Sequence, residues 1–209
     1  PKVKENSTAV IFFLMDVSGS MSQDRKFLAR SFFFLLYQFL NHKYEQVDVV
    51  FISHSTYAKR VDENDFFKVG THGGTIISTA LELELETISK EYHPNSWNIY
   101  SFYCGDGENW TSDNEKCITL FKQIKEVSQL TGYCEINEHY KGLADEIRKD
   151  DPFYGTPWGT FSAWKNEEME NLWSKINPLC DNIFKKVMVG EADHIWRAFH
   201  ALFGGGNQK

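Results

Sequence analysis

A continuous apolar run at residues 9–15, ending at Asp16, constrains the fold of this chain more than any other feature. A run without polar alternation predicts a strand covered on both faces, as in a parallel sheet. Strand-like runs recur at residues 47–53, 97–104 and 183–189, and helical patterns stand between them. Strands that alternate with helices indicate an α/β fold with mostly parallel strands.

The same patterns predict the order of all the elements. Strands are expected at residues 9–15, 47–53, 57–61, 97–104, 133–138 and 183–189. Helices are expected at residues 25–42, 76–91, 114–130, 164–176 and 192–203, with one or two helical turns at 62–68. The short strand at 57–61 follows a tight turn and is therefore antiparallel to its neighbour. The predicted fold is an open, Rossmann-like α/β sheet of about six strands, mostly parallel, with one antiparallel edge strand and helices on both faces.

The length of 209 residues fits a single domain. We expect this domain to cover residues 1–204, with an insertion at 141–164 in which turn residues and aromatic residues mix. The tail at 205–209 is expected to be disordered. Because the chain begins at Pro1 rather than Met, we expect a C-terminal fragment of a longer protein.

Charge and hydropathy disfavour two classes of partner. The formal net charge of −7 gives little electrostatic support for binding nucleic acid or an anionic membrane surface. The apolar segment at residues 27–40 is shorter than the roughly 20 residues that span a bilayer, and Arg30 and Gln38 interrupt it. We therefore expect neither nucleic acid nor membrane as a partner, and interpret this segment as a helix buried on most sides.

The four cysteines, at positions 104, 117, 134 and 180, form no CxxC pair, which disfavours zinc-ribbon chemistry. Cys104 and Cys134 lie in apolar, strand-like runs and are expected to be buried thiols in a reducing compartment. No signal-peptide pattern precedes the first apolar run. A cytoplasmic location is the expectation.

Oxygen-bearing side chains occupy alternate positions directly after the first strand, at Asp16, Ser18 and Ser20. Gly19 lets this turn fold tightly, so the three side chains can point at one spot. Thr75 follows a Gly-Gly pair on a loop that opens a helix. In open α/β sheets, ligands bind beyond the carboxyl ends of the strands, which is where these residues are expected.

Asp106 ends the next buried strand within a Gly-Asp-Gly sequence, and we expect it to join Asp16, Ser18, Ser20 and Thr75. Carboxylate and hydroxyl oxygens are hard ligands that suit Mg²⁺, or Mn²⁺, rather than zinc. Two carboxylates neutralise a dication. The octahedral geometry of Mg²⁺ then leaves a position for an outside oxygen, such as a carboxylate from a protein partner.

The Asp-x-Ser-x-Ser sequence after a strand, the Gly-Gly-Thr sequence and the later Gly-Asp-Gly sequence together resemble the metal-ion-dependent adhesion site of von Willebrand factor A domains. The resemblance implies that Ser18, Ser20 and Thr75 coordinate the metal. It also implies that Asp16 and Asp106 bind the metal directly or through water. A protein-interaction module, rather than an enzyme, is what this family resemblance predicts.

A narrower resemblance covers residues 9–110 strongly and continues weakly to residue 138. The segments FFLMDVSGSM (12–21), FFFLLY (32–37), VFISH (50–54), WNIY (97–100) and GDGENW (105–110) are similar to the bacterial YeaH/YhbH family. That family is associated with sporulation or stress and is uncharacterised biochemically. Its known associations suggest a serine kinase or a SpoVR-type protein as the partner.

Five further residues are candidates for the rim of the metal site. They are Gly19 and Gly74, which flank the predicted ligands, Glu108, which follows Asp106, and two histidines, His54 and His72. Histidine is a poor first choice for Mg²⁺, so a rim or core role is expected for both histidines. Glu108 is expected to shape the rim.

The rival hypothesis is a Mg²⁺-dependent hydrolase that acts on a phosphoester, with Glu108 or His54 as the base. No dedicated base motif and no second cluster of acids supports it. The serines also lack the Gly-x-Ser-x-Gly surroundings of a nucleophile.

In the helix at 76–91, a solvated face is expected for Glu82, Glu84, Glu86 and Glu91.

Overall fold

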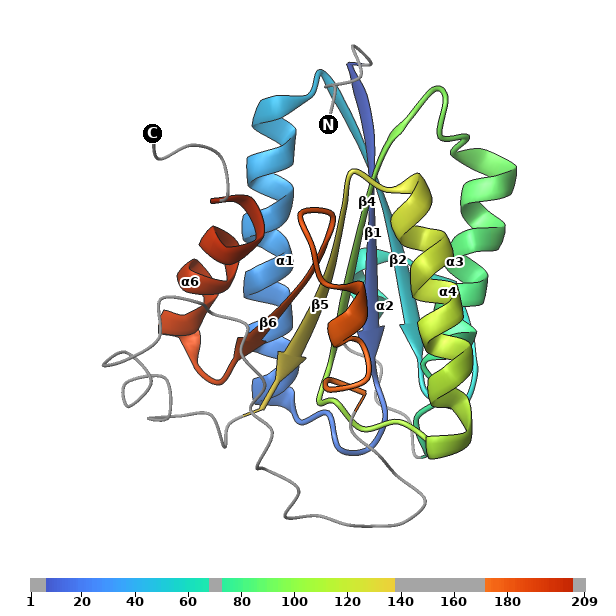
Figure 1. Ribbon diagram of the computed structural model, residues 1–209. Helices are drawn as coiled ribbons and strands as arrows, with labels where there is room; N and C mark the ends of the chain where they lie inside the picture. The colour runs from blue at the N-terminus through green and yellow to red at the C-terminus, as the bar shows by residue number, and fades with distance from the viewer. Residues whose placement is uncertain (1–6, 68–72, 138–171, 205–209) are drawn as a thin grey trace.

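Six strands form one sheet in the order β3-β2-β1-β4-β5-β6 (Figure 1). The structure, a computed structural model, describes residues 7–67, 73–137 and 172–204. The strands are β1 (Thr8–Asp16), β2 (Gln46–His54), β3 (Ala58–Val61), β4 (Asn98–Gly105), β5 (Leu130–Ile136) and β6 (Phe184–Val189). β3 is antiparallel to β2, and every other neighbouring pair is parallel. The predicted sheet, with its one antiparallel edge strand, is confirmed.

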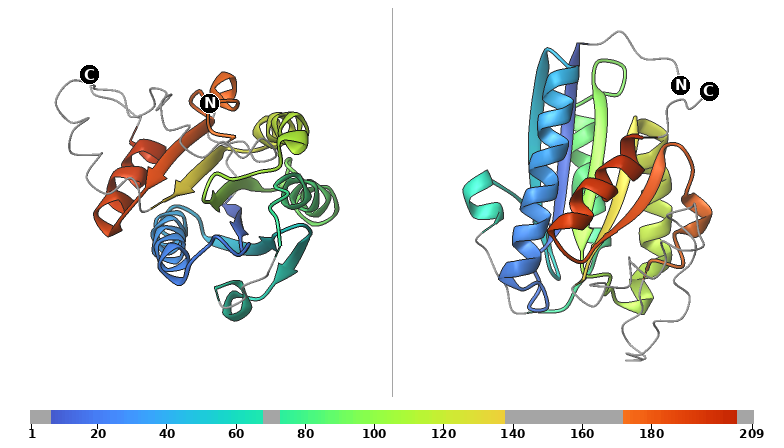
Figure 2. Two further views of the ribbon diagram at one scale, coloured as in Figure 1. Left: turned by 90° about the horizontal axis from the view of Figure 1, so that it is seen from below. Right: turned by 90° about the vertical axis from the view of Figure 1, so that its left-hand side faces the viewer.

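Helices cover both faces of this sheet. The α-helices are α1 (Gln23–Lys43), α2 (Glu63–Phe66), α3 (Ser78–Glu91), α4 (Asn114–Val127) and α6 (Ala192–Phe203), with short 3-10 helices η1 (Thr111–Asp113) and η3 (Asn177–Leu179). Figures 1 and 2 show α1 and α6 on one face and α3 and α4 on the other. This is the predicted layered α/β architecture.

The central strand β1 is buried on both faces because its side chains alternate between two hydrophobic cores. Ile11 and Phe13 belong to the core beneath α1 and α6, where the ring of Phe13 stacks on Phe33 at 4.3 Å between centroids. Phe12 and Leu14 belong to the core beneath α3 and α4. A strand with two covered faces cannot tolerate polar alternation, which explains the continuous apolar run.

Two neighbouring element boundaries differ from the expectation by three residues. The helix predicted to reach residue 130 ends at Val127, and β5 begins at Leu130 rather than at Tyr133. The backbone N–H of Gln129 donates to the carbonyl of Ile99 at 2.8 Å, so the chain already joins the sheet at this point. Pairing with β4, a long-range contact, therefore overrides the local helical pattern.

Several expectations fall on residues that the structure does not describe. The insertion at 141–164, the tail at 205–209, and most of the helix predicted at 164–176 lie outside the described residues. The described remainder of that segment, residues 172–176, forms turns that lead into η3. The helix expected there is therefore wrong for residues 172–176.

Helix α1 is more exposed than its apolar sequence suggests. One side is buried, including Phe32, Phe33 and Leu36, whereas Phe27 and Phe34 are 64% and 62% exposed. The expectation of a helix buried on most sides is therefore wrong for these two rings. Within the described ranges, no helix has both the length and the apolar content needed to cross a membrane.

The thiols of Cys104, Cys117 and Cys134 are buried, as expected for Cys104 and Cys134, while Cys180 is exposed.

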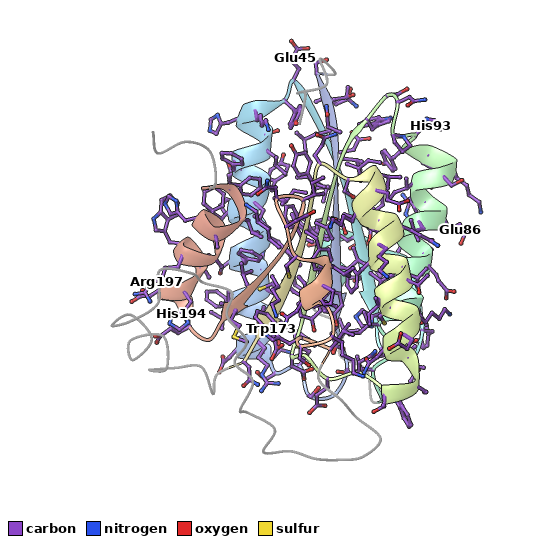
Figure 3. The ribbon with its side chains drawn as sticks, in the orientation of Figure 1. Glu45, Glu86, His93, Trp173, His194 and Arg197 are labelled. Carbon is purple, nitrogen blue, oxygen red and sulfur yellow. The ribbon has the colours of Figure 1, made fainter. Side chains whose placement is uncertain are left out.

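Among the four glutamates of α3 expected in solvent, Glu82, Glu86 and Glu91 are exposed, and Glu86 projects away from the sheet (Figure 3). Glu84 is instead completely buried, because it shares a helix face with residues 80, 81, 87 and 88 that pack on the sheet. Burial raises the pKa of Glu84 from 4.5 to about 8, and the nearby Ser101 hydroxyl offsets only part of this effect.

We predict that Glu84→Gln flattens the dependence of folding stability on pH. The native state holds a proton on Glu84 up to about pH 8, whereas the unfolded chain loses it near pH 4.5. Stability therefore falls as pH rises through this window, by about 1.4 kcal/mol per pH unit at most. Urea unfolding between pH 5 and 8 measures the slope. Glu82→Gln, on the exposed face, should keep the wild-type slope; parallel curves for Glu84→Gln and wild type would contradict the prediction.

Candidate metal centre

The five predicted ligand residues converge at the carboxyl end of the sheet. Asp16 ends β1 and Asp106 directly follows β4, and these two strands are neighbours (lower edge of the sheet in Figure 1). Ser18 and Ser20 lie on the loop between β1 and α1, and Thr75 lies on the loop that leads to α3. Three loops that are distant in sequence thus meet at one place.

Asp16 is at the centre of this arrangement and is fully buried. Its Oδ1 accepts a hydrogen bond from the backbone N–H of Ser18 at 2.7 Å, and the hydroxyl of Thr75 is 3.4 Å from its Oδ2. Burial, and secondly the charge of Asp106, raise the pKa of Asp16 to about 7, although the bonds from Ser18 and Thr75 favour the ionised form. The carboxylate is therefore held where its negative charge lacks full compensation.

The remaining oxygens lie next to this carboxylate. The hydroxyls of Ser18 and Ser20 are 3.1 Å apart. Asp106 accepts the backbone N–H of Glu108 at Oδ1 (3.1 Å), in a turn where Gly107 has a φ of 88° that favours glycine. The second oxygen of Asp106, Oδ2, accepts a hydrogen bond from Nη1 of Arg25 at 3.2 Å.

The loop that carries Thr75 is held by backbone hydrogen bonds on both sides. The N–H of Ile76 donates to the carbonyl of Ser55 at 2.8 Å, and the N–H of Trp110 reaches the carbonyl of Thr75 at 3.4 Å. Gly74 lies against the indole of Trp110, so that a Cβ at this position would stand 2.6 Å from Nε1. The Gly-Gly-Thr sequence therefore needs its second glycine because a large side chain packs on the backbone.

Two buried polar residues after Asp106 fasten this loop to the start of α3. The side-chain oxygen of Asn109 accepts the N–H of Ile77 at 3.1 Å, and Oδ2 of Asp113 accepts the N–H of Ser78 at 3.0 Å. Asn109 also donates to Asp113, and the thiol of Cys117 donates to the same carboxylate oxygen. Asn109 and Asp113 thus satisfy orphan N–H groups of the first turn of α3.

Asn109, Asp113 and Arg25 belong to no motif that predicts their roles. Asn and Asp are helix-capping residue types, but here they bind the N–H groups of a helix more than 30 residues earlier in the chain. Arg25 lies in the first turn of α1, where the sequence pattern predicted only a helix start. None of these roles has a local sequence signal, because each depends on contacts between distant loops.

The residues expected at the rim occupy different environments. Gly19 and Glu108 are exposed beside the ligand residues, and Gly74 is half-buried. His54 is fully buried at the end of β2, with its ring 5.5 Å from that of Tyr103, and burial lowers its pKa to about 4. Of the rim and core roles expected for His54, the structure shows the core role, and His72 falls outside the described residues.

The donor set fits a hard dication. In the described ranges, no group of three or more His, Cys, Asp and Glu side chains is arranged to hold a metal, so the hydroxyls would have to contribute. The convergent groups here are two carboxylates and three hydroxyls, all oxygen donors of the kind that Mg²⁺ and Mn²⁺ prefer. A buried carboxylate that resists ionisation is the group that a nearby cation would stabilise.

The fold and the convergent oxygens define a Rossmann-like α/β domain with a candidate ligand site at the carboxyl edge of its sheet. The family model described as "Protein of unknown function (DUF444)" matches residues 1–205, and the chain belongs to this family. The expected resemblance to an uncharacterised bacterial family is thereby confirmed.

Curated relatives support the same assignment. A UPF0229 protein of Ruminiclostridium cellulolyticum is 51% identical over 147 residues, which cover 70% of this chain and 37% of the relative. A UPF0229 protein of Halalkalibacterium halodurans is 46% identical over 152 residues, covering 68% of this chain and 39% of the relative. The chain thus spans less than two fifths of the length of these relatives.

Among solved structures, an aerotolerance-related membrane protein from Bacteroides fragilis has a similar fold. The match has a TM-score of 0.54 at 13% identity and covers 92% of this chain and 96% of that one. At this level of identity the similarity concerns the fold alone.

We predict that Asn109→Ala loosens the loop that carries Thr75. The variant leaves the N–H of Ile77 buried without its partner, which costs about 1–3 kcal/mol of folding stability. Urea unfolding measures the loss, and hydrogen exchange of the amides of residues 76–78 should accelerate. Asn41→Ala, at an exposed position of α1, is the control and should change stability by less than about 0.5 kcal/mol. Equal exchange rates in wild type and Asn109→Ala would contradict the prediction.

Proposed function

We propose that this chain is a von Willebrand factor A-type interaction module. It binds Mg²⁺, or Mn²⁺, through Asp16, Ser18, Ser20, Thr75 and Asp106 and presents the metal to a carboxylate of a protein partner. The observation that carries the proposal is the convergence of these five oxygen donors at the carboxyl ends of β1 and β4.

Electrostatics supports the metal. Asp16 is fully buried, and Asp106 is near enough to disfavour its ionisation. A dication between the two carboxylates would offset both the burial and the repulsion. Each aspartate is buried or nearly buried, where an ionised carboxylate is costly unless its charge is compensated.

The open position of the site favours a protein partner, rather than a small enclosed substrate, as its ligand. Gly19, Ser20 and Glu108 are exposed, so one side of the donor cluster faces solvent. Octahedral coordination of Mg²⁺ leaves room for an oxygen from outside. An acidic side chain on another protein has the charge and geometry to occupy that position. The chain itself would recognise and hold this partner and would perform no reaction.

The biological setting follows from the family resemblance. We propose a role in bacterial stress or sporulation signalling, with a serine kinase or a SpoVR-type protein as the partner. The relatives are more than twice as long as the matched region, so other parts of the full protein would share in this role.

Calorimetric titration of Mg²⁺ tests the metal site. We predict that wild type binds Mg²⁺ and that Asp16→Ala reduces the affinity by at least about tenfold, because one of two neutralising carboxylates is lost. Asp24→Ala is the matched control, since Asp24 is an exposed acid in the first turn of α1 and should bind like wild type. Equal affinity of wild type and Asp16→Ala would refute the proposed site.

A Mg²⁺-dependent phosphoester hydrolase is the second candidate, and the position of Glu108 is the observation that favours it. Its backbone N–H binds Asp106, and partial burial, followed by the charge of Asp106, raises the pKa of its carboxyl group, as a general base requires. His54 is a poor base because it is enclosed in the core.

We predict no Mg²⁺-dependent turnover of a panel of generic phosphoesters by wild type. Glu108 is an exposed acid whose backbone N–H binds Asp106, and one base without a second acid cluster is a weak hydrolytic arrangement. The measurement is release of phosphate or of a coloured alcohol over hours. Turnover by wild type that Glu108→Gln abolishes would favour the hydrolase over the interaction module.

A further inference from the structure

Arg25 reaches into the candidate metal centre, although it is none of the predicted ligands. The hydroxyl of Ser22 accepts its backbone N–H at 3.2 Å and so caps the start of α1. From this fixed position the side chain folds back over the loop between β1 and α1. Its Nη1 donates to the carbonyl of Ser20 at 2.9 Å and to Oδ2 of Asp106 at 3.2 Å.

These two bonds use only part of the guanidinium. The side chain of Arg25 is 17% exposed, and that of Asp106 only 3%, so their ion pair is largely shielded from water. The Nε of Arg25 is buried and has no hydrogen-bond partner among the described residues. A guanidinium with a rigid fork and an unsatisfied donor is thus held at the edge of the site.

We propose that Arg25 competes with the metal for Asp106, and that its release couples metal binding to recognition of a partner carboxylate. This inference rests on the proposed function, because it concerns the same site. It adds a residue that controls how tightly the site holds a metal, and it explains how the site senses an acidic ligand.

The competition follows from the shared oxygen. Oδ2 of Asp106 accepts a hydrogen bond from Arg25, and Oδ1 accepts one from the N–H of Glu108, so each oxygen already has one donor. A dication that uses Asp106 must therefore share this carboxylate with a guanidinium that it repels. The ion pair with Arg25 lowers the affinity for the metal until the guanidinium moves away.

The released guanidinium has a second role. It remains tethered to the first turn of α1 and to the carbonyl of Ser20, next to the open side of the site. A planar guanidinium pairs well with a carboxylate through two parallel hydrogen bonds. Arg25 would therefore pair with the partner carboxylate while one oxygen of that carboxylate binds the metal.

Charge counting favours a single carboxylate as the ligand. Three acids, Asp16, Asp106 and Glu108, stand against two basic residues, Arg25 and the buried Lys26, whose charge acts on Asp16. A bound dication leaves one positive charge, which one carboxylate neutralises. Metal and carboxylate should therefore bind cooperatively, each making the other more favourable.

The test compares Arg25→Gln with wild type by two affinities. Binding of Mn²⁺ is measured by electron paramagnetic resonance. Binding of N-acetylglutamate α-amide, a probe with one side-chain carboxylate, to the Mn²⁺-loaded protein is measured by water proton relaxation. We expect Arg25→Gln to bind Mn²⁺ about tenfold more tightly and the probe about tenfold more weakly.

Two further variants separate charge from geometry. Arg25→Lys keeps the positive charge but lacks the planar fork, so it should keep the wild-type Mn²⁺ affinity and still lose affinity for the probe. Arg30→Gln removes one positive charge from the same helix, where the guanidinium lies over the ring of Phe67, and should leave both affinities unchanged.

The outcomes are distinguishable. Mn²⁺ binding by Arg25→Gln but not by wild type would support the competition and contradict the predicted metal binding by wild type. Mn²⁺ affinities of wild type and Arg25→Gln within a factor of two, or equal binding of the probe, would overturn this inference and leave the proposed metal site standing. No Mn²⁺ binding by either protein would refute both the proposed function and the role of Arg25.

Discussion

The buried carboxylate of Asp16 is the constraint around which the candidate site at the carboxyl edge of the sheet is organised. It ends the central strand, where both faces of the sheet are covered and water is excluded. A carboxylate in such a place needs partners, and the N–H of Ser18 and the hydroxyl of Thr75 supply two. Asp106 adds a repulsive charge, which a bound cation would offset. The loops at this edge thus hold two acids close together, an arrangement that a bound dication would favour.

The rigidity of the site comes from a buried polar network rather than from the site residues. Asn109 and Asp113 hold the first N–H groups of α3, and Trp110 packs on Gly74. These contacts join the loop after β4 to the loop before α3. As a result, Thr75 and Asp106 keep a fixed separation although they lie on different loops. Preorganisation of this kind reduces the entropy that a bound ion would otherwise have to offset.

Much of the fold and of the candidate site could be predicted from the sequence, for identifiable reasons. The apolar run of β1 implies two covered faces, and parallel strands place their carboxyl ends together. Asp16, Ser18 and Ser20 follow one strand directly, so their proximity is local. Thr75 and Asp106 could be predicted as site residues because each lies in a glycine-rich sequence expected at the same edge of the sheet.

The errors share one physical origin. The sequence predicts Glu84 on a charged, solvated helix face, but it is buried because position 84 lies on the side of α3 that packs on the sheet. The sequence leaves a rim or a core role open for His54, and the packing of Tyr103 beside it encloses its ring in the core. The end of α4 depends on a hydrogen bond from Gln129 to Ile99 in a neighbouring strand. In each case a contact between distant segments outweighs the local pattern.

The sequence alone therefore determined the fold class, the strand that carries the site and the chemical character of its donors. These properties depend on hydrophobic periodicity and on residue types within one loop, which are local. Tertiary structure alone decided that Arg25 pairs with Asp106 and that Asn109 and Asp113 secure α3. Those pairings join residues 32 to 81 positions apart, so they exist only once the sheet has brought their loops together.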